Sequence, residues 1–215
     1  LAAKEAAWTV ALSPGEPGTD DVLTATATTH DAEGDAVTLD WAWYVDGSLA
    51  AGTTDTLDGA TAFSRGDVVY AVATPYDGVM YGTPVASASV TIQNTAPTTP
   101  TIAVSPSRPR SATDALVCSI TTASTDADAD SVSYTVSWTR NGSSWTGATS
   151  TTTRTGDTIG ASSVATGDVW VCSVLASDGT TNSGTATATA TARAPLTGTA
   201  LTSTAYGLTG VSQYD

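Results

Sequence analysis

The amino-acid sequence predicts an all-β protein made of two consecutive copies of one β-sandwich. Three observations lead to this prediction: a composition that favours strands, a two-residue alternation of apolar and polar side chains, and an internal repeat. Threonine, serine and alanine are abundant throughout the 215 residues, and few are charged. Because β-branched side chains fit a pleated, half-buried surface, a chain rich in threonine and valine favours strands over helices.

The alternation is clearest in two segments that each end in a tryptophan. Residues 39–43 read Leu-Asp-Trp-Ala-Trp, and residues 134–138 read Tyr-Thr-Val-Ser-Trp. A period of two is typical of a strand with one buried face. Turn signals separate such runs, and they fall at Asp46-Gly47, Asp77-Gly78, Asn141-Gly142 and Asp178-Gly179.

The repeat defines the domain organisation. Short motifs recur at offsets of 95 or 101 residues, and the opening segment Val10-Ala-Leu-Ser-Pro14 returns as Ile102-Ala-Val-Ser-Pro106. A Pro- and Thr-rich segment between the copies is expected to be a short, extended linker. The predicted parts are a lead (1–7), a first sandwich (8–93), the linker (94–100), a second sandwich (101–194) and a β-prone tail (195–215).

The charge excludes several classes of function. The formal net charge is −14, and the seven basic residues form no cluster. Neutralising the phosphates of a nucleic acid or of an anionic membrane requires such a cluster, so neither is an expected partner. The apolar runs are too short for a membrane span. The acidic balance favours solubility and divalent cations instead.

The second repeat carries the pattern that points to a known family. Cys118, Trp138 and Cys172 lie in that order, and Asp168 and Trp170 precede the second cysteine by four and two residues. This pattern resembles immunoglobulin domains. More broadly, residues 8–193 resemble the tandem immunoglobulin-like, PKD-like and cadherin-like repeats of bacterial surface and secreted proteins. The spacing from Cys118 to Trp138 is longer than in antibody domains, because it contains an acidic loop.

The resemblance implies a Cys118–Cys172 disulfide that joins two sheets over a buried tryptophan. In the first repeat the aligned positions are Ala25 and Ala71, so both cysteines are missing together, as expected for a bonded pair. A disulfide implies an oxidising compartment, and we therefore expect an extracellular, secreted or cell-surface protein. Two buried free thiols are the alternative.

Acidic loops are the candidate metal sites. In a sandwich of this family, the loop holding the acidic triplet and the loop holding the later Asp-Gly lie at one pole, so the carboxylates of the second repeat should gather near Asn94. Calcium prefers six to eight oxygen ligands, and cadherin-like repeats bind it at their joints. The alternative is a solvated turn whose side chains cap backbone amides. The candidate calcium ligands are Asp126, Asp128, Asp130, Asp178, Asp31, Glu33, Asp35 and Asp77.

Other motifs are weaker. Asn141-Gly142-Ser143 matches an N-glycosylation sequon, although a hairpin turn explains Asn-Gly equally well. Arg65-Gly66-Asp67 spells an integrin-binding tripeptide, but Gly-Asp recurs at residues 167–168 and therefore reflects the fold. His30 is the only histidine, and it has no nucleophile motif beside it. We therefore predict that the protein is not an enzyme.

The sequence favours an extracellular structural protein, a stalk or filament subunit that binds other copies of itself or further repeats. The tail and the lead could add a strand to a neighbour's sheet, so assembly by strand exchange through the termini is one form of this hypothesis. The alternative is an adhesin or a carbohydrate-binding module that recognises cell-surface glycans. Trp41 and Trp145 motivate it, because neither has an aromatic counterpart in the other repeat.

Overall fold

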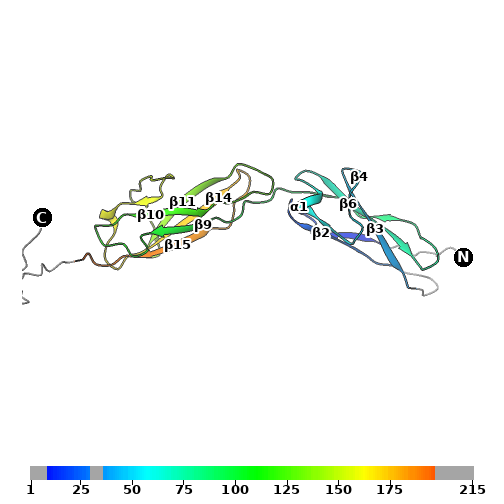
Figure 1. The fold of residues 1–215 in the computed structure, drawn as a ribbon, viewed down its shortest axis with the longest axis horizontal. Coiled ribbons are helices and arrows are strands. Elements are labelled where there is room, and N and C mark those ends of the chain that lie inside the picture. Colours follow the sequence, from blue (N-terminus) through cyan, green and yellow to red (C-terminus); the bar gives the residue numbers. More distant parts are fainter. Residues whose placement is uncertain (1–8, 30–35, 197–215) are drawn as a thin grey trace, which may run out of the picture. The chain divides into compact units, whose positions relative to one another are not determined.

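A computed structural model describes residues 9–29 and 36–196, and nearly all of their regular structure is β (Figure 1). The predicted lead, most of the predicted tail, His30 and three of the candidate calcium ligands (Asp31, Glu33, Asp35) lie outside the described residues. Within the described part of the chain, no helix has the length and apolar character needed to cross a membrane.

The first repeat folds into two antiparallel sheets. One sheet has the order β1 (Val10–Ser13), β2 (Val22–Ala27), β5 (Thr56–Asp58). The other has the order β4 (Ser48–Leu49), β3 (Thr38–Val45), β6 (Val68–Tyr76), β7 (Val85–Ala86), and β8 (Val90–Thr91) also pairs with β6. A single helical turn, α1 (Gly59–Ala62), follows β5, and the side chain of Asp58 caps it.

The second repeat has the same plan. One sheet has the order β13 (Thr158–Ile159), β10 (Leu116–Thr122), β9 (Thr101–Ser105). The other has the order β12 (Ser143–Ser144), β11 (Ser133–Arg140), β14 (Val169–Ser177), β15 (Ala186–Thr191), and a 3-10 turn occupies Ala161–Ser163. This all-β arrangement of immunoglobulin-like sandwiches confirms the predicted fold class.

The chain divides into two compact units that are not simple halves of the sequence. The first contains the residues up to Pro100 together with Thr122–Tyr134 and Leu175–Thr185. The second contains Thr101–Thr121, Thr135–Val174 and the residues from Ala186 onward. Two loops of the second repeat, one acidic and one containing Asp178, therefore belong to the first unit.

The alternation seen in the sequence becomes the core of each sandwich. Trp43 is completely buried and Trp138 is 4% exposed, while the intervening polar residues of β3 and β11 face solvent. β6 and β14 show the same alternation over nine residues each. The glycine turns also form as expected: Asp46 and Gly47 have φ angles of 47° and 77°, and Asn141 and Gly142 have 51° and 81°. Two successive positive φ angles are typical of a tight hairpin turn.

The predicted disulfide is confirmed, and it joins β10 to β14 and thus one sheet to the other. The Cα atoms of Cys118 and Cys172 lie 6.3 Å apart. The first repeat has buried alanines at the equivalent positions. The equivalence is shown by matching hydrogen bonds, since the amide of Ala25 donates to the carbonyl of Asp55 and that of Cys118 donates to the carbonyl of Asp157.

Replacing both cysteines with alanine should destabilise the second sandwich while leaving its fold intact, because the first sandwich already folds with alanines there. For a sequence separation of 54, the chain-entropy estimate is a loss of about 4 kcal/mol in the free energy of unfolding. Urea unfolding of the double variant, compared with the oxidised parent, measures this loss. An unchanged unfolding midpoint would show that the cross-link does not constrain the unfolded chain.

A buried carboxylate organises the turn that precedes β13. Asp157 is 1% exposed and accepts hydrogen bonds from the backbone amides of Thr152, Thr153 and Arg154 at 2.7–2.8 Å, and from the hydroxyl of Thr158. Burial alone raises the pKa of a carboxyl group, but these backbone donors outweigh it and lower the pKa of Asp157 to about 2.

Acid should therefore weaken the second sandwich through Asp157. Since the pKa is lower in the folded chain than in the unfolded chain, this stabilisation is complete above about pH 4 and disappears as the pH falls through 2. The shift corresponds to about 2 kcal/mol. Asp157→Asn should show that loss in urea unfolding at pH 7 and little further loss near pH 2. Asp55→Asn, at the equivalent but exposed position of the first repeat, is the control and should change little.

Candidate functional site

The acidic triplet forms a tight loop between β10 and β11. The side chain of Asp126 accepts hydrogen bonds from the backbone amides of Asp128 and Asp130, at 3.0 and 3.1 Å. Ala129 has a φ of 61°, so the chain turns back on itself there. As a result, one carboxylate oxygen from each of the three aspartates lies within 4.8 Å of the others.

Asp128 anchors this loop to the linker. Its side chain is 1% exposed, and one oxygen accepts the backbone amide of Thr95 at 2.7 Å while the other accepts the hydroxyl of Thr19. The amide of Thr19 in turn donates to the hydroxyl of Thr95 at 2.7 Å. A buried carboxylate is costly unless it is hydrogen-bonded, so these donors fix its position.

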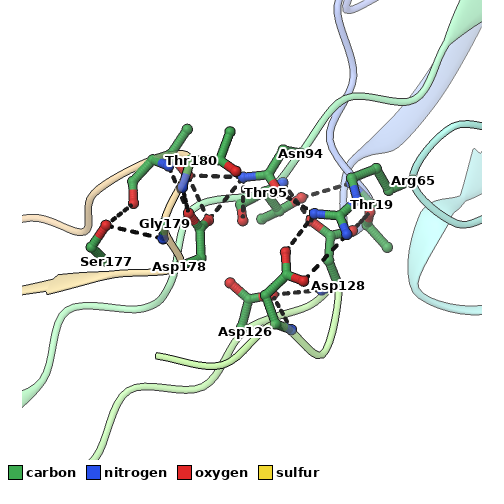
Figure 2. Close-up of polar contacts among 12 residues, drawn as sticks. Thr19, Arg65, Asn94, Thr95, Asp126, Asp128, Ser177, Asp178, Gly179 and Thr180 are labelled. Carbon is green, nitrogen blue, oxygen red and sulfur yellow. Dashed lines mark hydrogen bonds and ion pairs between the residues drawn. The ribbon is translucent and has the colours of Figure 1, made fainter. Parts of the chain in front are cut away.

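Arg65 supplies a positive charge to the same cluster (Figure 2). Its guanidinium contacts both carboxylate oxygens of Asp130 and the side-chain oxygen of Asn94, and it lies 3.9 Å from Asp128. The hydrogen bond to Asp130 raises the pKa of Arg65. No role for Arg65 was predicted from its position. One difference between the repeats could have drawn attention to this residue, since the second repeat has Thr166 at the equivalent position and thus no basic residue there.

Asn94 links this cluster to the loop that follows β14. Its side-chain amide donates to the carboxylate of Asp178 at 2.9 Å and to the hydroxyl of Thr181 at 2.8 Å. Asp178 also accepts the backbone amides of Thr180 and Thr181, both at 2.6 Å. The Thr181 amide and the Asn94 side chain lower the pKa of Asp178.

We refer to this set of contacts as the Asn94 network, and all of its members lie in the first compact unit. They are Thr19, Arg65, Asn94, Thr95, Asp126, Asp128, Asp130, Asp178 and Thr181. The network places four of the predicted calcium ligands near Asn94, as the family topology suggested. Asp77, another predicted ligand, lies in the loop after β6, where the backbone amides of Met80 and Val79 bind its carboxylate and lower its pKa.

The oxygens of the cluster are largely committed to partners in the chain. Both oxygens of Asp128 accept hydrogen bonds, and those of Asp130 contact Arg65. Asp126 keeps one buried oxygen that has no hydrogen-bond partner among the described residues. This donor set falls short of the six to eight oxygens that calcium prefers, and the guanidinium already balances part of the negative charge. Calcium binding at these residues stays a prediction.

The remaining candidates are also engaged. The side-chain amide of Asn141 donates to Asp168 at 3.1 Å, and its oxygen accepts the amide of Val169, so the nitrogen that glycosylation requires is already used. Glycosylation there also stays a prediction. Trp145 is half-buried against Trp170, with ring centroids 4.9 Å apart, and a side chain at Gly147 would clash with it.

Comparisons with known proteins identify no family for this chain. No protein-family model matches the sequence, and no curated protein sequence matches it either. Among the solved structures that resemble it are the FN1–FN3 domains of chicken CNTN1, with 13% identity over 86% of this chain and 65% of that one and a TM-score of 0.34. Murine CEACAM1b has 11% identity over 88% of this chain and 100% of that one, with a TM-score of 0.33. Three N-terminal domains of the outer capsid protein Hoc of bacteriophage RB49 have 17% identity over 87% of this chain and 59% of that one, with a TM-score of 0.32. This chain therefore spans less than two thirds of the chicken and phage structures, and at these scores the fold assignment rests on strand order and the disulfide.

Proposed function

We propose that the chain is an extracellular structural module, whose tandem immunoglobulin-like repeats form part of a cell-surface stalk or filament of the kind found in bacterial surface proteins. The fold and the Cys118–Cys172 disulfide are compatible with an extracellular setting. Other copies of the chain, or further repeats of the same type, are the proposed partners.

The Asn94 network is the observation that carries this proposal. Its charged and amide side chains bind backbone amides, hydroxyls and one another. Asp128 holds the amide of Thr95, Asp178 holds its own loop, and Arg65 bridges Asn94 to Asp130. Polar groups used in this way stabilise loops and a linker, which suits a load-bearing module better than a catalytic one.

An adhesin or carbohydrate-binding module is the second candidate. Trp41 favours it, because this half-buried ring lines a shallow surface hollow together with Leu39 and Asp55. Trp145 does not add to it, since Trp170 and the Gly147 backbone cover much of that ring. Trp41 also packs against the core, and this contact gives it a structural role.

Negative-stain electron microscopy of the full chain tests the structural proposal. Regular filaments in buffered calcium are the expected result, because a stalk or filament subunit must associate with its own kind. Their persistence in EDTA would assign assembly to protein contacts, and their loss would assign it to the metal. Separate particles at every concentration would contradict the filament form and favour an adhesin.

Calcium binding by the acidic loop is a proposal in its own right, and Arg65 provides the means to test it. Removal of the guanidinium frees Asp130 and deletes a positive charge beside the three carboxylates. In Arg65→Ala, calcium affinity measured by calorimetry should therefore rise by ~10-fold or more over the parent chain. Arg108→Ala, which removes an exposed arginine of the second repeat, is the control. No heat of binding in either the parent or Arg65→Ala would refute the proposal.

A further inference from the structure

The loop after β6 and the loop after β14 share a backbone conformation but differ in their side chains. In each loop the aspartate amide donates to the carbonyl three residues later at 3.3 Å, from Asp77 to Met80 and from Asp178 to Thr181. In both loops the aspartate side chain also accepts hydrogen bonds from the backbone amides two and three residues later. The two loops are thus equivalent, and Val79 and Met80 stand where the second repeat has Thr180 and Thr181.

The first of these loops exposes apolar surface. Val79 is 82% exposed, Met80 46% and Tyr81 62%. The ring of Tyr81 packs against Tyr76 with centroids 4.7 Å apart, so the loop has an aromatic support. In the second repeat the equivalent pair is Ser177 and Asn182. Several adjacent exposed apolar side chains on a turn are typical of a contact surface.

The segment after β8, which carries Asn94 and binds the loop after β14, also has an equivalent in the second repeat. The amide of Gln93 donates to the carbonyl of Pro17 at 2.7 Å, and the amide of Arg193 donates to that of Pro109 at 2.8 Å, so the segments after β8 and β15 are equivalent. Asn94, which binds Asp178 and Thr181, therefore corresponds to Ala194.

Both members of the Asn94–Thr181 contact are thus apolar in the other copy. Asn94 is replaced by Ala194, and Thr181 is replaced by Met80. The segment that carries Ala194 adds an exposed proline and Leu196, which is 74% exposed. Pro195 stands in place of Thr95 and has no amide to donate, so a hydrogen-bonded contact like that of Thr95 with Asp128 cannot form there.

Charge supports the same pairing. Arg193 is exposed, and it forms no ion pair among residues 9–29 and 36–196, although its charge contributes to lowering the pKa of Asp114. The loop that exposes Met80 carries Asp77, and Asp40 hydrogen-bonds Tyr81 and raises the pKa of its hydroxyl. A basic, apolar segment and an acidic, apolar loop are complementary.

We propose that residues 193–196 of one copy of this chain dock on loop 77–81 of a second copy, in the way that Asn94 docks on loop 178–181 within one chain. The polar pair joins two segments of one compact unit, and the apolar pair joins one copy to the next. This proposal rests on the proposed structural function, for which it names the contact between copies.

Cross-linking between full-length single-cysteine variants tests the contact directly. Met80→Cys protein, carrying a mass tag, is mixed with Ala194→Cys protein and treated with a short bis-maleimide, which leaves the native disulfide intact. A cross-linked heterodimer on reducing gels is expected. Leu49→Cys, at another exposed apolar residue of the first repeat, replaces Met80→Cys in the control. A heterodimer no more abundant than that control would overturn the proposal.

A double-mutant cycle then tests the pairing itself. Met80→Thr and Ala194→Asn should each weaken self-association in sedimentation equilibrium by ~10-fold or more, because each opposes a polar group to an apolar one. Combining them recreates the Thr181–Asn94 pair and should restore association to within ~3-fold of the parent chain. A double variant that associates no better than the single variants would overturn the pairing.

Electron microscopy of the filaments separates this contact from the proposed structural function. Filaments of unchanged length in Met80→Thr would overturn this contact and leave the structural function standing. The absence of filaments in the parent chain would count against the structural function itself.

Discussion

Each repeat depends on one tryptophan that lies between its two sheets. The ring N–H of Trp43 donates to the carbonyl of Thr54, and that of Trp138 donates to the carbonyl of Gly156, both at 2.9 Å. A buried indole N–H is costly to leave unpaired, and these hydrogen bonds remove that cost for Trp43 and Trp138. In both repeats the acceptor lies just before a strand of the opposite sheet. The tryptophan therefore fills the space between the sheets and also ties its own sheet to the start of a strand in the opposite sheet.

The two repeats fill that space with different side chains. The second has Trp170 and the disulfide, with Trp170 packed edge-on to Trp138 at 6.3 Å. The first has the smaller Val69 and Ala71 in their place, and it has Phe63, 6% exposed, where the second has Val164. Cores tolerate such exchanges when the total volume is kept. One architecture is thus stabilised by a cross-link in one copy and by packing in the other.

The fold was predictable because its determinants are local or repeated. Strand alternation, Asp-Gly and Asn-Gly turns and the paired loss of Cys118 and Cys172 are all visible in neighbouring residues or in the comparison of the two copies. The topology of the family that the sequence resembles also predicted that Asp178 lies near Asn94. Arg65 could not be predicted in this way, since its partners lie 29 and 65 residues away and the contact leaves no period in the sequence. Similarly, the hydroxyl of Thr19 reaches Asp128 across 109 residues.

The turns that the two repeats share indicate why function in this molecule is expected in side chains that the fold leaves unconstrained. In both loops the Asp-Gly pair alone sets the backbone, because the aspartate binds two amides and the glycine takes a φ near 94°, which is 95° at Gly78 and 93° at Gly179. The side chains of the two residues after the glycine are therefore not needed to form the turn. In one loop they are threonines, and Asn94 and Asp178 use them within the chain. In the other they are apolar and exposed, at a cost in solvation that the sandwich itself does not require. A side chain that folding neither needs nor favours is where binding to another molecule has the most freedom to act.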